Sequence, residues 1–200
     1  MKVIGINSSP REKGNTYLMM NRFMTKLEKQ GIETEIIHIG GKWIRGCQGC
    51  NACRQMKNER CAIDDELNAV IPKLKEAQGL ILGAPTYYAD VPAEMKAFID
   101  RAGRVTGANG RMLERKLGAA VIAVRRGGAI HAFDTINHFF LISGMIVPGS
   151  SYWNMGIGRD AGDVLEDDEG LATMDRLADN FSWLLKKIGG NCEEKPFASR

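Results

Sequence analysis

The chain has 200 residues, of which 44% are hydrophobic and 26% charged, and its formal net charge is +3 at pH 7. This composition is typical of a soluble globular protein, so residues 1–200 are expected to form a single domain. The nearly balanced charge argues against a nucleic-acid partner, and no apolar stretch reaches the ~18 residues of a membrane helix. Because the first ten residues also lack the pattern of a signal peptide, we expect a cytoplasmic protein with no membrane partner.

Short apolar runs alternate with amphipathic stretches along the whole chain. The apolar runs predict strands at 2–6, 33–39, 79–84, 117–124 and 145–148. The amphipathic stretches predict helices at 16–29, 65–77, 93–104, 132–143 and 170–188. Strict alternation of this kind is typical of a parallel sheet with helices on both faces. We therefore predict an α/β fold of the flavodoxin-like type, with a five-stranded parallel sheet in the order 2-1-3-4-5 and its ligand at the carboxyl ends of the strands.

The loop between the first strand and the first helix is rich in hydroxyl groups and contains an arginine and a glycine, in the run NSSPREKGNT from Asn7 to Thr16. The amino end of the following helix adds N–H groups and a positive dipole, so the loop suits one terminal phosphate group. It lacks both the Gly-Lys-Ser/Thr ending of a nucleoside triphosphate loop and the G-x-G-x-x-G pattern of a dinucleotide turn. An ordinary loop with Asn15 or Thr16 as the helix N-cap is the alternative.

The pattern S-x-P-R-x-x-G-N-T in this loop resembles the phosphate loop of the NADPH-dependent FMN reductase family. The resemblance implies that the FMN phosphate is held by Ser9, Arg11, Asn15 and Thr16, with Ser8 as a further candidate.

The loop after the third strand presents polar and aromatic groups where Pro85 ends the strand. Tyrosine offers a flat apolar surface with a hydrogen-bonding tip, which suits a flavin ring. The alternative is that the tyrosines only cover the edge of the domain. The run P-x-Y-x-x-x-x-P-A-x-x-K-x-x-x-D-R, which begins at Pro85, resembles the second signature of the same family and implies ring contacts from Pro85, Thr86, Tyr87 and Tyr88.

Two further features belong to this predicted flavin site. Lys96, Asp100 and Arg101, at the end of the second signature, are expected to fix the helix or a partner subunit rather than to contact flavin. After the fourth strand, Gly127 and Gly128 allow close approach of the backbone, so we predict that both contact the flavin.

Four of the five cysteines, Cys47, Cys50, Cys53 and Cys61, lie in a loop at 43–64 between the second strand and the next helix, and Cys192 lies outside this motif. C-x2-C-x2-C is a spacing that iron–sulfur sites use. Four thiolates also suit a closed zinc site. Bare thiols or a redox-sensitive disulfide are the remaining alternatives.

The run from Gly46 to Cys53, followed by Cys61-Ala-Ile-Asp-Asp, resembles the compact cysteine motif of the iron–sulfur flavoproteins, a branch of the same family. The resemblance implies a [4Fe-4S] cluster on Cys47, Cys50, Cys53 and Cys61, beside FMN. The last gap departs from the compact motif, because it is seven residues long and contains charged side chains.

Taken together, the resemblance implies an FMN-dependent oxidoreductase that passes electrons from NAD(P)H or ferredoxin to a small acceptor. No catalytic side chain is assigned, because the flavin and backbone amides suffice for the chemistry. Relatives imply a homodimer or homotetramer. The alternatives are a metal-free NAD(P)H-dependent FMN or quinone reductase and a non-enzymatic regulatory domain with zinc or no cofactor.

Overall fold

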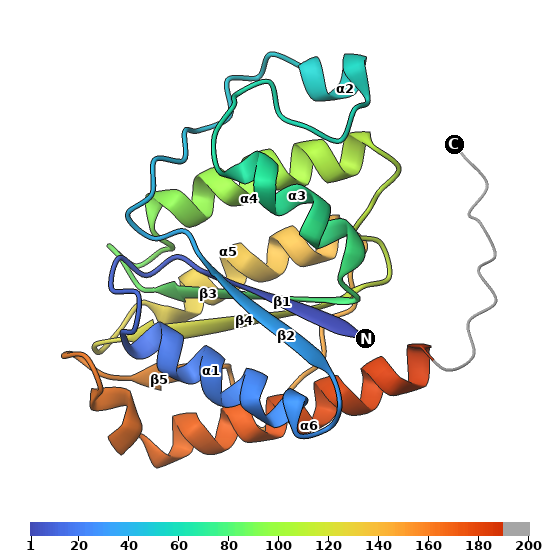
Figure 1. The fold of residues 1–200 in the computed structure, drawn as a ribbon. Coiled ribbons are helices and arrows are strands. Elements are labelled where there is room, and N and C mark those ends of the chain that lie inside the picture. The colour runs from blue at the N-terminus through green and yellow to red at the C-terminus, as the bar shows by residue number, and fades with distance from the viewer. Residues whose placement is uncertain (190–200) are drawn as a thin grey trace.

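The computed structural model describes residues 1–189, so Cys192 lies outside the described residues. Its centre is a five-stranded parallel sheet in the order β2-β1-β3-β4-β5, which confirms the predicted fold (Figure 1). The strands are β1 (Lys2–Asn7), β2 (Glu33–His38), β3 (Gly79–Pro85), β4 (Leu117–Val124) and β5 (Met155–Ile157).

Helices cover both faces of the sheet: α1 (Asn15–Glu28) and α6 (Asp168–Gly189) lie on one face, and α3 (Leu67–Glu76), α4 (Ala93–Ala108) and α5 (Ala129–Ile142) on the other (Figure 1). On the first face Phe23 and Phe181 pack edge to face, with ring centroids 5.4 Å apart. On the second face Phe98 and Phe140 are fully buried. Each face therefore has its own apolar core.

The three central strands are almost continuously buried because helices cover both of their faces. Their carboxyl ends meet at one edge of the sheet: Asn7 pairs with Gly83, and Pro85 pairs with Ala123. The loops that follow β1, β3 and β4 consequently gather at this edge, at the left of Figure 1.

The predicted fifth strand at 145–148 is wrong in position. Ile146 forms a single parallel bridge with Leu117, through hydrogen bonds to the backbone of Lys116 and Gly118. Pro148 follows, and since proline has no N–H group it cannot extend the ladder. The chain next pairs with the sheet at β5, whose three residues pair with Ile122–Val124 at the carboxyl end of β4.

Two short elements were not predicted, namely α2 (Ala52–Met56) inside the cysteine loop and the 3-10 helix η1 (Asp163–Glu166) after β5. Asn51 and Lys57 flank α2 in left-handed conformations, so the loop coils tightly on both sides of the helix. Figure 1 shows the loop and α2 projecting beyond α3 and α4, away from the sheet. Within residues 1–189, none of the helices combines the length and apolar character needed to span a membrane.

Candidate functional site

The loop after β1 is fixed by its own polar groups. The backbone N–H and the hydroxyl of Ser8 both donate to the carbonyl of Gly83 at 3.0 Å, so Ser8 joins β1 to β3. Ser9 is also buried, and its hydroxyl accepts a hydrogen bond from the backbone N–H of Arg11 at 3.2 Å. The hydroxyl proton of Ser9 is therefore available to a ligand, whereas that of Ser8 is used within the sheet.

The side chains of Thr16 and Asn15 differ in the hydrogen-bonding groups that they leave free for a ligand. The Thr16 side chain is buried, and its hydroxyl has no hydrogen-bond partner within residues 1–189. The amide of Asn15 donates to the carbonyl of Asp160 and accepts from the N–H of Gly162, both at 2.8 Å. Asn15 thus fastens the segment after β5 to the start of α1, a neighbour for which the sequence carries no signal.

The ordinary-loop alternative required Asn15 or Thr16 to be the N-cap of α1, and neither residue is. The N-cap is Gly14, which has no side chain to cap the helix. A buried hydroxyl without a partner costs free energy unless a ligand satisfies it, so the first turn of α1 fits an anionic group.

Gly40, just after β2, lies against the loop after β1 at a distance that only glycine permits. A Cβ atom at Gly40 would lie 1.9 Å from the carbonyl oxygen of Ser9. The ring nitrogen Nε2 of His38 lies 2.8 Å from the same oxygen. Gly40 and His38 together fix the position of Ser9.

The loop after β3 forms a tight hairpin. Tyr87 and Asp90 exchange two backbone hydrogen bonds of 2.8 and 3.0 Å, and the intervening Tyr88 and Ala89 both have left-handed backbone conformations. Tyr87 is half exposed and Tyr88 fully exposed at the tip. Both aromatic surfaces are therefore accessible to a flat ligand, and the strained backbone is of the kind found at functional sites.

Thr86 stands at the base of this hairpin. Its backbone N–H donates to the carbonyl of Ala123 at 2.9 Å, while its buried hydroxyl lacks a partner in the described part of the chain. Thr86, directly after β3, therefore provides a second buried hydroxyl without a described partner, as Thr16 does after β1.

The third loop packs directly on the hairpin. Gly128 is the N-cap of α5 with φ of 89°, and a Cβ atom there would lie 3.0 Å from Cα of Ala89. Asp90 accepts a hydrogen bond from the hydroxyl of Thr135 at 2.8 Å and pairs with His131 at 3.3 Å. These contacts bind α5 to the hairpin, so Gly128 adjoins the predicted ring contact Thr86 at the amino end of a helix, and Gly127 directly precedes it.

The three loops thus offer unsatisfied buried hydroxyls, accessible tyrosines and helix amino ends at one edge of the sheet. These groups fit FMN, whose phosphate and ring need hydrogen-bond donors at one end and flat surface at the other.

The four clustered cysteines line one small pocket, together with Arg101 and Arg104 of α4. Cys47 and Cys50 are exposed, and Cys53 and Cys61 are half-buried. Among residues 1–189, no three histidine, cysteine, aspartate or glutamate side chains are already arranged as a metal-binding group. The donor set nonetheless fits a soft metal centre, since four thiols share one pocket.

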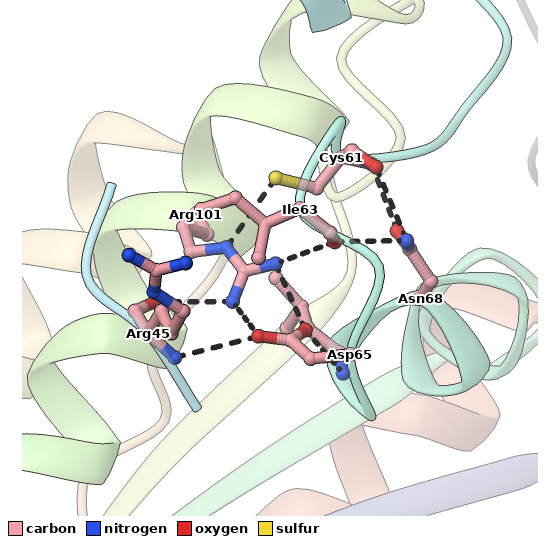
Figure 2. A network of polar contacts seen from close by, with 7 residues as sticks. Arg45, Cys61, Ile63, Asp65, Asn68 and Arg101 are labelled. Carbon is pink, nitrogen blue, oxygen red and sulfur yellow. Dashed lines mark hydrogen bonds and ion pairs between the residues drawn. The ribbon is translucent and has the colours of Figure 1, made fainter. Parts of the chain in front are cut away.

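Helix α4 holds the cysteine loop through three polar side chains. Arg104 donates to the side-chain oxygen of Asn51 at 2.5 Å. Asn109, at the end of the helix, accepts the N–H of Glu59 at 3.1 Å and donates to the carbonyl of Cys53 at 3.5 Å. The third side chain, Arg101, is buried and reaches Cys61, as Figure 2 shows.

The ion pair between Arg101 and Asp65 is the electrostatic centre of this region. Burial alone would raise the pKa of Asp65, but the hydrogen bonds and charge of Arg101, together with the N–H groups of Arg45 and Leu67, outweigh it and lower that pKa. Burial likewise opposes the charge of Arg101, yet Asp65 and Cys61 raise the pKa of the guanidinium above its usual value.

The three residues at the end of the second signature differ in their contacts. Lys96 and Asp100 pair with each other at 2.5 Å, a contact within α4, and their expected contact with a partner subunit stays a prediction. Arg101 fixes the cysteine loop, a partner that the sequence did not indicate.

Three comparisons relate the chain to known proteins. The family described as NADPH-dependent FMN reductase matches residues 1–160. An iron-sulfur flavoprotein of Methanocaldococcus jannaschii is 38% identical over 195 residues, which cover 94% of this chain and 99% of that protein. An iron-sulfur flavoprotein of Methanosarcina thermophila is 32% identical over 193 residues, with 96% and 98% covered. In fold, the Trp repressor binding protein from Bacillus subtilis is similar, with a TM-score of 0.66 at 18% identity, covering 88% of this chain and 96% of that one.

Proposed function

The chain belongs to the NADPH-dependent FMN reductase family, and from this premise we propose that it carries a [4Fe-4S] cluster on Cys47, Cys50, Cys53 and Cys61 beside FMN. It is an FMN-dependent oxidoreductase that transfers electrons, as the family and its flavoprotein relatives establish.

The observation that carries the cluster proposal is the shared pocket of the four cysteines. Residues 47 and 61 are separated by an intervening helix, yet their side chains line the same hollow. Thiolates at this spacing are the ligands that iron–sulfur clusters use. Two relatives aligned over nearly the whole chain bear the name iron-sulfur flavoprotein, which supports the same assignment.

The residues proposed to hold FMN divide between phosphate and ring. The hydroxyls of Ser9 and Thr16, the guanidinium of Arg11 and the first turn of α1 would bind the phosphate, with Asn15 as their support. Ser8 would stabilise the same loop through its bonds to Gly83.

Four residues of the β3 loop, together with the glycines after β4, are proposed to bind the ring. The Thr86 hydroxyl would donate to a polar edge of the ring, Tyr87 and Tyr88 would cover its apolar surface, and Pro85 would set the direction of the loop. Gly127 and Gly128 would let the amino end of α5 approach, where a helix dipole favours negative charge. When bound, FMN would supply two-electron chemistry and the cluster one-electron transfer.

The proposed electron donor is NAD(P)H or a ferredoxin, and the proposed assembly is a homodimer or homotetramer. Anaerobic titration of the flavin absorbance with NADH, NADPH and reduced ferredoxin separates the donors. Light scattering of the same preparation measures the assembly.

The test of the cluster is a determination of FMN, iron, acid-labile sulfide and zinc in protein purified without oxygen. We expect one FMN and about four iron and four sulfide per chain. Cys61→Ser should keep FMN and lose most of its iron, whereas Cys192→Ser, outside the motif, should keep both. FMN without iron in the parent protein would favour the metal-free reductase, and stoichiometric zinc without flavin would favour the regulatory domain.

A further inference from the structure

Arg101 uses every hydrogen-bond donor of its guanidinium on the cysteine loop and its flanks (Figure 2). Its two Nη atoms donate to the carboxylate of Asp65 at 2.5 and 2.9 Å and to the carbonyls of Arg45 and Ile63, each at 3.1 Å. Its Nε donates to the sulfur of Cys61 at 3.3 Å. A guanidinium has five N–H donors in a fixed plane, so five acceptors are matched at once.

The backbone of Cys61 is held separately by Asn68 of α3. The side-chain oxygen of Asn68 accepts the N–H of Cys61 at 2.8 Å, and its nitrogen donates to the carbonyls of Cys61 and Ile63 at 3.1 Å. Asn68 is itself buried. The main chain of Cys61 is thus fixed by α3 while its sulfur is oriented by α4.

This arrangement distinguishes Cys61 from the other three cysteines. Cys47 and Cys50 are exposed, and Cys53 lies on the short helix α2. Within residues 1–189, Cys61 is the member of the motif whose sulfur accepts a hydrogen bond from a charged side chain. The cysteine that follows the long seven-residue gap therefore has both its main chain and its sulfur held by buried side chains.

The Arg101 side chain is completely buried, and that of Asp65 is 8% exposed. A bidentate pair with Asp65 needs only two of the five donors, and the pair alone would not require Nε to face a sulfur. The direction of Nε toward Cys61 therefore calls for an explanation beyond the stability of the ion pair.

We propose that Arg101 is a positioning residue for Cys61, which orients its sulfur toward the cluster pocket and raises the reduction potential of the cluster. This inference rests on the proposed iron–sulfur function. Reduction makes the thiolate ligands more negative, and hydrogen bonds to the sulfurs are among the features that set cluster potentials. A buried N–H donor that carries positive charge stabilises the reduced form more than the oxidised form.

The test compares Arg101→Gln and Arg101→Lys with the parent, all purified without oxygen. Glutamine removes the charge, and lysine keeps the charge but has three donors on one atom, so it cannot reach sulfur, carboxylate and carbonyls together. The two readouts are iron per FMN and the midpoint potential of the cluster, measured by a redox titration followed by electron paramagnetic resonance.

In Arg101→Gln we expect either at least half of the iron to be lost with FMN retained, or a fall in potential equivalent to a tenfold change in the reduction equilibrium, about 59 mV for one electron. The iron per FMN and the midpoint potential of Arg101→Lys should lie between those of Arg101→Gln and those of the parent. Should Arg101→Gln fail to fold, Arg101→Lys decides by the same measurements.

Arg22→Gln is the matched control. Arg22 of α1 also belongs to an arginine–aspartate pair, since it donates to the carboxylate of Asp175 on α6 at 2.9 and 2.6 Å. Both residues lie on the opposite face of the sheet from α4. The substitution should leave iron per FMN and the midpoint potential close to those of the parent, because neither residue of this pair lines the cysteine pocket.

Parental iron and potential in both Arg101 variants, or equal losses in Arg22→Gln, would overturn the inference. A parent protein without iron would instead refute the proposed cluster, so the two failures are distinguishable.

Discussion

Gly40→Ala tests whether the loop after β1 is the phosphate site. The new methyl group would lie 1.9 Å from the carbonyl oxygen of Ser9, 2.3 Å from its carbon and 2.8 Å from the nitrogen of Pro10. Since all three atoms belong to the backbone, the loop must move by roughly 1 Å to admit it, and such overpacking costs about 1–3 kcal/mol of stability. A displacement of this size should raise the Kd for FMN about 100-fold, which is about 2.7 kcal/mol.

The assay is a titration of apoprotein with FMN and with riboflavin, followed by flavin fluorescence. Because riboflavin lacks the phosphate, its Kd should change little in Gly40→Ala, and the preference for FMN should shrink. Gly149→Ala is the control, because apart from the glycine itself and its two chain neighbours no described atom lies within 4 Å of a Cβ at that position. If Gly40→Ala were destabilised yet kept the parental Kd for FMN, the phosphate would not lie in this loop.

Three further predictions concern the flavin site. Arg11→Ala should weaken FMN about tenfold and leave riboflavin unchanged, as the same titration would show, since one charged hydrogen bond is worth roughly 1.5 kcal/mol. Thr16→Val should stabilise the apoprotein against urea by about 1 kcal/mol, because it removes a buried hydroxyl without a described partner, and should weaken FMN. Replacing both Tyr87 and Tyr88 with alanine should restore much of the fluorescence that bound FMN loses to the tyrosines, and unchanged quenching would show that they do not contact the ring.

The sequence predicted the central strands well because helices bury both of their faces, so each reads as an unbroken apolar run. It failed at the edge of the sheet. The apolar residues 145–148 favoured a strand there, but β5 is the three-residue run Met155–Ile157. Its position is set by pairing with Ile122–Val124 of β4, and long-range pairing leaves no mark in a short local sequence.

In the candidate site, too, local sequence patterns did not reveal contacts between distant parts of the chain. Local patterns singled out the loop after β1, the loop after β3 and the cysteines, since each follows a recognisable strand, and the roles of these residues toward FMN and the cluster stay predictions. They did not reveal the segment from Arg159 to Gly162 beside the loop after β1, which carries no motif of its own. Nor did they connect Arg101 with Asp65 and Cys61, because 36 and 40 residues separate the partners.

Asp65→Asn measures how strongly the buried ion pair holds the cysteine loop. The substitution leaves the fully buried charge of Arg101 without its carboxylate partner, so we expect a loss of about 3–5 kcal/mol in the free energy of unfolding at neutral pH. The pKa of Asp65 is lower in the folded protein than its ordinary value of about 3.9. Its contribution is therefore complete above that ordinary value and is lost as the pH falls through the lower folded one. Urea unfolding between pH 3 and pH 7 should show a difference in the free energy of unfolding between parent and variant that is constant above about pH 5 and narrows below about pH 4.

Asp64→Asn is the matched control. The side chain of Asp64 is 89% exposed and pairs only with Arg60 among the described residues, so its substitution should cost less than about 1 kcal/mol. Equal losses in the two variants would mean that the pair of Asp65 and Arg101 does not hold the loop.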